Sequence, residues 1–231
     1  MPTLSSPCTD KLFSDFFTCA RQNSVFFRCN TLFSKHSPLA MHDQFLRLLK
    51  NIAPLTNADT TLCTTYFEPV LYPKNRVIEE AGIVPKYLYF VLSGYVRLFY
   101  YDDIGNEVTT HINCPPGFIT SYFSFLHQTE AKEYVECVTE SALLRITKPH
   151  LDALFEQSAA LKAVSINVFQ ESLAYNEQRA NDLATLTAEE RYRKLIAKQP
   201  DIVHNVPIQY IASFLGMKPE SLSRIRRKIL A

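Results

Sequence analysis

The chain of 231 residues lacks any apolar run that approaches the roughly 20 residues of a membrane-spanning helix. Near its amino terminus, Asp10 and Asp15 interrupt any apolar core, and no small-residue cleavage site follows one, so we expect no secretory signal there. These absences favour a cytoplasmic protein without a membrane partner.

The chain also lacks closely paired cysteines. Its six cysteines are Cys8, Cys19, Cys29, Cys63, Cys114 and Cys137. An even number is compatible with disulfides, but a long chain without a secretory signal is more typical of reduced thiols. Iron–sulfur sites usually include a pair of cysteines two residues apart, and these spacings are far wider. We therefore expect no cofactor.

Clusters of catalytic or metal-binding side chains are missing as well. His111 is followed two residues later by Asn113 rather than by a second histidine. The other histidines are scattered, at His36, His42, His127, His150 and His204. No nucleophile lies beside a general base in the sequence, so we expect no catalytic residues, no metal and no enzyme activity.

What the chain does have is a sizeable apolar fraction and a basic carboxyl-terminal end. Hydrophobic residues make up 47% and charged residues 20%, which is typical of folded domains. The net charge of the chain is only +1, yet residues 188–231 hold nine Lys or Arg against four Asp or Glu. A basic segment on a nearly neutral chain indicates a nucleic-acid partner.

Within that segment, residues 206–229 have the pattern of a helix-turn-helix. Apolar residues recur where two crossed helices would pack together, at Ile211, Leu215, Met217, Leu222 and Ile225. Ala212 is small where the helices approach, Gly216 suits a left-handed turn, and Pro219 suits the first turn of the second helix. The remaining polar residues of the second helix are predicted to contact DNA: Lys218, Glu220, Ser221, Ser223, Arg224, Arg227 and Lys228. An ordinary helical hairpin would share the apolar spacing but would not explain the charge.

Upstream, the hydrophobic period changes from helical to strand-like. Residues 1–40 have no sustained period and form an atypical tail, in which a weak helix over residues 11–20 is possible. Because Met41 is a plausible native start, we expect this tail to be dispensable. Residues 42–66 have helical spacing, first at Phe45, Leu48, Leu49 and Ile52 and then in a second short helix from Asn57 to Tyr66, with Asn57 as a cap. Six short β-rich runs follow, over residues 67–72, 76–79, 87–92, 95–101, 107–113 and 133–147. Such spacing predicts a sandwich or small barrel, interrupted by a short helix over residues 121–126.

A single long helix is predicted over residues 148–182. Leu154, Leu161, Val168 and Tyr175 recur every seven residues, and Ile166, Phe169 and Leu173 form a second stripe. Two stripes suit packing on the barrel and on a partner helix, although one wide buried face would also produce them. We favour dimerisation, because two-fold DNA sites need paired protein subunits. A capping box at residues 187–190 then begins the helix that precedes the helix-turn-helix.

This order of elements resembles the Crp/Fnr family of transcription regulators over residues 41–231. Residues 87–99 look like the β-roll core of that family, and Glu220-Ser-Leu-Ser223-Arg224 matches its Glu-x-x-Ser-Arg pattern. The resemblance implies an α+β fold with a β-roll (double-stranded β-helix) sensor domain, a long dimerisation helix and a winged-type helix-turn-helix domain. The corresponding ranges are 41–150, 151–183 and 184–231. By the same resemblance, Glu220, Ser223 and Arg224 would contact base edges.

The effector pocket departs from the family pattern. Members that bind cyclic nucleotides have Gly-Glu at the start of a phosphate cassette and Arg-Ser or Arg-Thr at its end, whereas Gly117 is followed here by Phe118, and Ala131-Lys132 stands at the end. Cyclic AMP is therefore not expected as the ligand. The pocket predicted for an unidentified small effector comprises Gly117, Phe118, Ser121, Tyr122 and Lys132. Phe118 and Tyr122, together with Phe123 and Phe125, would suit an apolar effector or simple packing.

The sequence thus predicts a homodimeric transcription regulator that binds double-stranded DNA, with RNA polymerase as a candidate partner. The alternatives are a β-roll protein that binds a small molecule and a metal-dependent cupin-like enzyme, both without DNA function.

Overall fold

The computed structural model describes residues 36–230, apart from the side chain of Leu230. The first 35 residues lie outside this range, and with them the helix predicted over residues 11–20 and three of the six cysteines. Helix α3 (Pro38–Ile52) begins before the expected boundary at residue 41, and the hydroxyl of Ser37 caps it by accepting a hydrogen bond from Ala40 N. Met41 is only 2% exposed. Met41 therefore lies inside α3, on the side of the helix that packs into the core, and not at the start of the helix.

The second helix, α4 (Asn57–Tyr66), has the predicted bounds but a different cap. Thr56, not Asn57, is the capping residue, and it forms a reciprocal capping box with Asp59.

The β-rich half of the chain forms two antiparallel four-stranded sheets, as a β-roll requires. One sheet has the order β1-β8-β3-β6 and the other β2-β7-β4-β5. The strands are β1 (Glu68–Tyr72), β2 (Arg76–Glu79), β3 (Tyr87–Ser93), β4 (Val96–Tyr101), β5 (Glu107–Asn113), β6 (Gly117–Ile119), β7 (Tyr134–Cys137) and β8 (Ser141–Thr147). The α+β prediction is confirmed.

Two strands differ from the sequence prediction. The run over residues 133–147 divides into β7 and β8, because the chain crosses there from one sheet to the other and Val138 N donates to Tyr95 O at 2.7 Å. The short strand β6 was not predicted; it pairs with β3 just before the expected short helix α5 (Tyr122–His127).

The long helix is interrupted. Helix α6 (Lys148–Gln157) and α7 (Ala159–Thr185) are separated by Ser158, whose backbone is extended. The Ser158 hydroxyl donates to Asp59 Oδ1 at 2.5 Å and accepts from Leu161 N at 3.1 Å, so it caps α7 and ties the break to α4. The prediction of one continuous helix from residue 148 was wrong because it could not include this contact.

Four helices complete the chain: α8 (Ala188–Lys198), α9 (Ile202–Asn205), α10 (Ile208–Phe214) and α11 (Pro219–Leu230). The short helix α9 was not predicted. Within residues 186–230 the structure contains no strand, so the winged form implied by the family resemblance is not present in this range.

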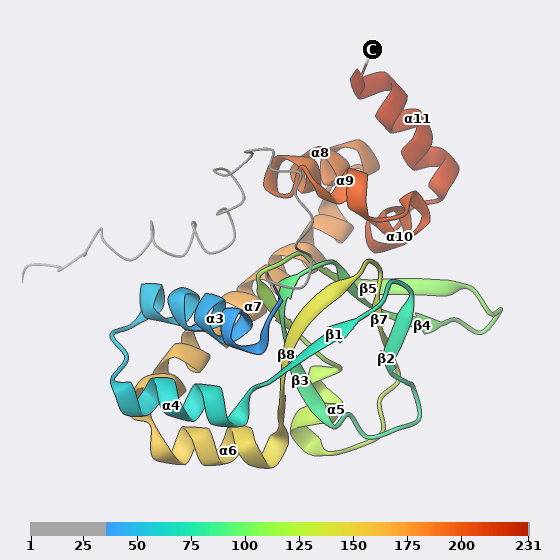
Figure 1. Ribbon diagram of the computed structural model, residues 1–231. Coiled ribbons are helices and arrows are strands. Elements are labelled where there is room, and N and C mark those ends of the chain that lie inside the picture. The colour runs from blue at the N-terminus through green and yellow to red at the C-terminus, as the bar shows by residue number, and fades with distance from the viewer. Residues whose placement is uncertain (1–35, 231) are drawn as a thin grey trace, which may run out of the picture.

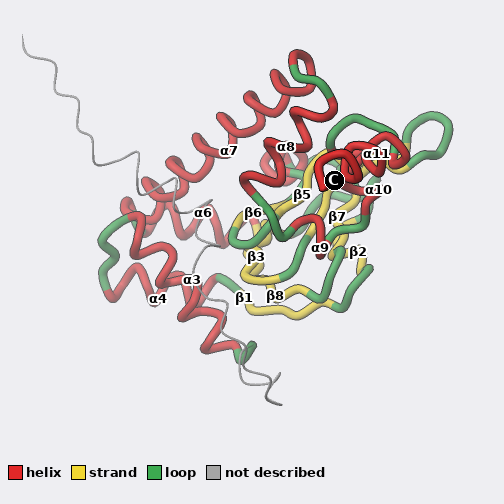
Figure 2. The backbone as a smooth tube through the Cα atoms, turned by 90° about the horizontal axis from the view of Figure 1, so that it is seen from above, coloured by secondary structure: helices red, strands yellow, loops and turns green. Residues whose placement is uncertain are grey.

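Helix α7 runs along one side of the β-roll and links α6 to the carboxyl-terminal helices (Figures 1 and 2). Three apolar clusters hold the parts together. One packs α3, α4, α6 and α7 on the roll, one fills the roll, and one joins Ile112 and Val138 of the roll to α8, α10 and α11. Helix α11 projects away from the roll, at the opposite end from α4 and α6 (Figure 1). No helix in the described part of the chain is long and apolar enough to cross a membrane.

Candidate nucleic-acid interface and effector pocket

Helices α10 and α11 form the predicted helix-turn-helix. Ala212 is fully buried where the helices meet, and its carbonyl accepts from Met217 N at 3.0 Å. Gly216 has a φ of +64°, which favours glycine, and a Cβ there would lie 3.2 Å from a methyl carbon of Leu183. The sequence therefore identified both residues that allow this turn.

Helix α11 is amphipathic, and this fixes which side chains face outward. Leu222 is fully buried, and Ile225 and Ile229 pack against the same cluster as Tyr192 and Ile211. The opposite face carries the predicted DNA contacts. Lys218, Glu220, Arg224, Arg227 and Lys228 are exposed, whereas Ser221 and Ser223 are partly buried at the edges of that face.

Two of the outward residues already have partners within the chain. Lys228 Nζ lies 2.8 Å from Glu189 Oε2 of α8, and Arg224 Nη2 donates to Ser221 Oγ at 3.4 Å. An exposed ion pair of this kind contributes only about 0–1 kcal/mol, so a phosphate group can replace Glu189 as the partner of Lys228.

Arginines from outside the motif hold its turn. Arg179 of α7 donates to Phe214 O at 2.8 Å and packs over the Phe214 ring, while Arg191 of α8 donates to Leu215 O at 2.9 Å. These bonds satisfy carbonyl groups at the end of α10 and connect the turn to α7 and α8.

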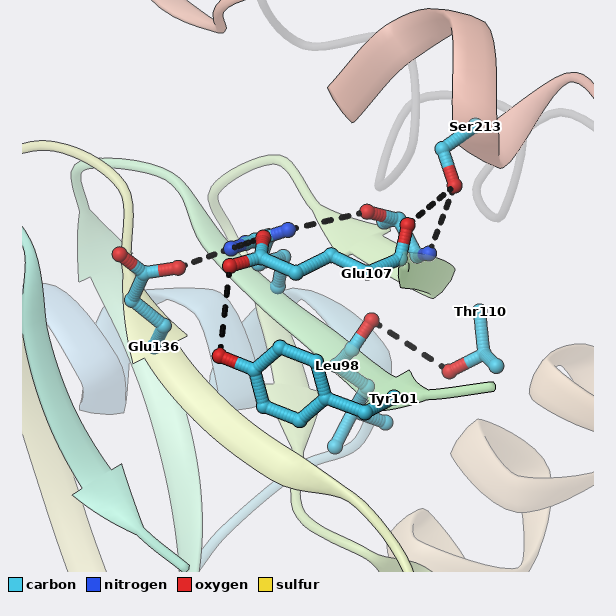
Figure 3. Close-up of polar contacts among 8 residues, drawn as sticks. Leu98, Tyr101, Glu107, Thr110, Glu136 and Ser213 are labelled. Carbon is cyan, nitrogen blue, oxygen red and sulfur yellow. Dashed lines mark hydrogen bonds and ion pairs between the residues drawn. The ribbon is translucent and has the colours of Figure 1, made fainter. Parts of the chain in front are cut away.

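Helix α10 covers the open edge of a β-sheet. Strand β5 is the last strand of its sheet, and Ser213 of α10 lies against its outer side (Figure 3). Thr109 N of β5 donates to Ser213 Oγ at 2.8 Å, and the Ser213 hydroxyl donates to Glu107 O at 3.4 Å. The first helix of the motif is thus hydrogen-bonded directly to the β-roll, at an edge that would otherwise expose unpaired backbone groups.

A buried arginine lies beneath the same contact. Arg97 of β4 is 1% exposed, and its guanidinium pairs with Glu136 at 2.6 Å and Glu107 at 2.5 Å. The guanidinium also lies 3.5 Å from the ring centroid of Tyr210 on α10. Tyr210 therefore covers an ion-paired arginine of the roll and shields it from water.

We name the set of Arg97, Thr109, Tyr210 and Ser213 the interdomain latch. The sequence analysis missed all four residues. Only Arg97 could have been noticed, because an arginine inside an apolar β run indicates a buried charge. Nothing in the sequence indicates that Arg97 contacts Tyr210.

The structure does not bring the predicted effector residues together. Phe118 packs on Phe90 with centroids 4.7 Å apart, and Tyr122 packs on Phe169 of α7 at 4.9 Å. Ser121 is buried and donates to Glu133 at 3.4 Å, and Lys132 is exposed. Gly117 lies against the Asn113 side chain. The neighbours described for these five residues thus differ from one to the next.

The position expected to bind a phosphate carries no cation. Ala131 is 3% exposed, its N–H donates to Ile83 O at 3.0 Å, and its carbonyl accepts from Gly82 N at 2.8 Å. Two carboxylates of the roll are held by threonine hydroxyls: Glu79 accepts from Thr120 at 3.2 Å, and Glu133 accepts from Thr110 at 2.6 Å. Burial raises the pKa of Glu79 to about 7, although hydrogen bonds from Tyr87 N and Thr120 act to lower it. Ala131 itself offers no side-chain donor to a phosphate group.

The three cysteines of residues 36–230 and His111 are buried or partly buried. Cys63, Cys114 and Cys137 are free thiols, and burial raises the pKa values of Cys63 and Cys114 to about 12. Burial and the nearby charge of Arg179 lower the pKa of His111 to about 4. Within residues 36–230 no three His, Cys, Asp or Glu side chains are placed to share a metal ion.

Comparison with known proteins agrees with this architecture. Residues 69–158 match the cyclic nucleotide-binding domain family. No curated protein sequence matches the chain.

Among solved structures, FixK2 from Bradyrhizobium japonicum is 15% identical, with a TM-score of 0.60 and coverage of 71% of this chain and 84% of that chain. The c-di-GMP responsive global regulator CLP of Xanthomonas campestris is 18% identical, with a TM-score of 0.57 and coverage of 76% and 92%. A transcriptional regulator of the CRP/FNR family from Thermus thermophilus is 20% identical, with a TM-score of 0.54 and coverage of 71% and 86%. At these identities the likeness establishes a shared fold.

Proposed function

We propose that the protein is a dimeric, sequence-specific DNA-binding transcription regulator, since residues 69–158 form a cyclic nucleotide-binding domain and the chain has the Crp/Fnr fold. The observation that carries this proposal is the geometry of α11. Its apolar side, at Leu222 and Ile225, is packed on the rest of the motif, so its polar and basic side is held facing outward.

The outward side has the chemistry needed to read a major groove. Arg224 can donate two hydrogen bonds to guanine, and Glu220, one helical turn earlier, can accept from cytosine. Lys218, Arg227 and Lys228 add positive charge for the phosphate backbone, and Ser221 and Ser223 supply hydroxyl donors. We assign base contacts to Glu220, Ser223 and Arg224, and backbone contacts to the others.

An apolar surface on α7 and α5 supports the dimer. Ile166 is 48% exposed and Leu173 is 70% exposed, and Phe169 lies between them on the same face of α7. Tyr122 packs on Phe169, and Phe123 of α5 is 70% exposed, so this surface extends onto the β-roll. We assign this surface to contact with a second copy of the chain, because paired motifs are needed for a two-fold DNA site.

The dimer is tested by replacing Leu173 with glutamate. The matched control is Ala174→Glu, because Ala174 is exposed on the same helix but points about 100° away. Sedimentation should show that Leu173→Glu dissociates the dimer at concentrations at which Ala174→Glu and the unchanged chain remain paired. Equal behaviour of the two variants would place the dimer contact elsewhere.

The interdomain latch provides a route from the β-roll to the DNA-binding unit. An effector that altered β4 or β5 would act on α10 through Tyr210 and Ser213, and thereby on the direction of α11. We expect this effector to differ from cyclic AMP, because Phe118 and Ala131 stand where the family pattern has the ribose-binding Glu and the phosphate-binding Arg. The protein is assigned to the cytoplasm, with RNA polymerase as a candidate partner.

The DNA-binding role is tested by comparing Arg224→Ala with Lys228→Ala on DNA selected from a random pool. Arg224→Ala should cost about 1–3 kcal/mol on the selected site and little on scrambled DNA. Lys228→Ala should weaken both alike and reduce the salt dependence by about one unit. If Arg224→Ala weakened both duplexes equally, Arg224 would contact phosphate instead of a base.

A further inference from the structure

A cleft lies where α7, α8 and the turn after α10 meet. Its volume is about 550 Å³, including the part that is open to solvent. Its walls include Tyr175, Arg179 and Asp182 from α7, Arg191, Lys194 and Lys198 from α8, and Phe214 and Leu215 from the turn. None of the residues predicted for the effector pocket lines it, so it is separate from the β-roll.

The cleft carries more positive than negative charge. Its walls contain four basic side chains and only one acidic side chain, that of Asp182. Lys194 Nζ lies 2.6 Å from Asp182 Oδ2, which accounts for one of the four. The other three, Arg179, Arg191 and Lys198, have no carboxylate within ion-pairing distance in the described part of the chain.

Arg179 lines this cleft, and one of its donors is unused. One terminal nitrogen of its guanidinium donates to Phe214 O, but the buried Nε has no hydrogen-bond partner among the described residues. A buried N–H without a partner is unfavourable, and a charged one more so. Burial lowers the pKa of Arg179 itself, although Tyr175 acts to raise it, and the charge of Arg179 helps to lower the pKa of nearby His111. The single carboxylate of Asp182 therefore balances only part of the positive charge in the cleft.

Lys198 is placed to act with Arg179. It lies one helical turn after Lys194 on α8, lines the same cleft, and is exposed without an ion pair in residues 36–230. A planar guanidinium from α7 and an ammonium from α8 in one cleft suit a ligand with several negatively charged oxygens.

We propose that this cleft binds a small molecule that carries a phosphate or carboxylate group, held by Arg179 and Lys198. The ligand would bridge α7 and α8 and contact the residues that hold the turn of the helix-turn-helix. Binding would then influence the direction of α11, and this consequence rests on the proposed DNA-binding function, whereas the binding itself does not.

The test measures binding without DNA, so its result is independent of the proposed function. The full chain is titrated with inorganic phosphate, with citrate, and with sodium chloride at matched ionic strength, and the thermal unfolding midpoint is followed. Arg179→Gln would also remove the bond to Phe214 O, so Lys198→Gln is the main variant. Lys162→Gln is its matched control, because Lys162 is exposed on α7 and does not line the cleft.

We expect phosphate or citrate to raise the unfolding midpoint saturably and beyond the effect of chloride. Lys198→Gln should weaken that binding about tenfold, and Lys162→Gln should leave it unchanged. A response to phosphate alone would identify a phosphate ligand, and a response to citrate alone a carboxylate ligand. The proposal is overturned if neither anion exceeds chloride, or if the two lysine variants respond alike.

Discussion

Replacing Ser213 with alanine should loosen the interdomain latch. In the docked arrangement Ser213 Oγ accepts the N–H of Thr109, a residue that is only 2% exposed. Alanine removes that acceptor and leaves a buried donor that water can reach only if α10 moves away from β5. The substitution therefore favours opening of the interface without altering the polar side of α11.

The size of the effect follows from the cost of an unsatisfied buried donor. That cost is about 1–3 kcal/mol, which corresponds to an increase of about 5-fold to 150-fold in the population of the open arrangement. In the closed arrangement of this variant Tyr210 can still pack on Arg97, so the chain should still fold.

Cys114 provides the assay, because it is partly buried at the same interface. Its thiol donates to Gln199 Oε1 at 3.0 Å across the two parts of the chain. Alkylation of Cys114, measured on its own peptide by mass spectrometry, should accelerate by the factor given above in Ser213→Ala. The control is Ser172→Ala, because that hydroxyl donates only to Val168 O within α7. The reasoning is refuted if Cys114 reacts no faster, or if Cys137, which lies fully buried in the roll, accelerates equally.

Three further outcomes are expected. Calorimetric titration with cyclic AMP should show no binding in the micromolar range, because Ala131 stands where the family pattern has a phosphate-binding arginine. Micromolar binding would contradict this. Glu79→Gln should stabilise the chain increasingly as the pH rises from about 4.5 to about 7, because in that range the unfolded chain releases the Glu79 proton while the folded chain, with a pKa of about 7, still holds it. Above a pH of about 7 the gain should stay constant. The upper limit of the gain is about 3 kcal/mol at pH 8, measured by urea unfolding, and a gain that did not vary with pH would exclude this cause. Ser158→Ala should lower stability by about 1–2 kcal/mol, because it removes the cap of α7 and the hydrogen bond to Asp59, and an unchanged urea midpoint would show that neither bond matters.

The sequence was most informative where local chemistry decides the structure. The capping box at Thr187 begins α8 as predicted, and the pattern of Ala212, Gly216 and Leu222 predicted the helix-turn-helix and the buried side of α11. These signals depend on residues a few positions apart, so the sequence contains all of the necessary information.

Features that depend on distant contacts were not predicted. The break at Ser158 depends on Asp59, which is 99 residues away in the chain. Burial of Arg97 depends on carboxylates of two other strands and on Tyr210, which is contributed by the carboxyl-terminal helices. The predicted effector residues are close in sequence, but closeness in sequence does not determine which way each side chain points: Phe118 packs on Phe90, and Lys132 is exposed.

The most direct test of the central claim is selection of DNA by the full chain from a random pool of duplexes. The account predicts enrichment of an inverted repeat whose half-sites are about 34 Å apart, because two α11 helices of a dimer should enter successive major grooves. It also predicts that Arg224→Ala relaxes the selected base at one position in each half-site. Recovery of no enriched sequence, or of a single unrepeated site, would contradict a dimeric reader that uses α11.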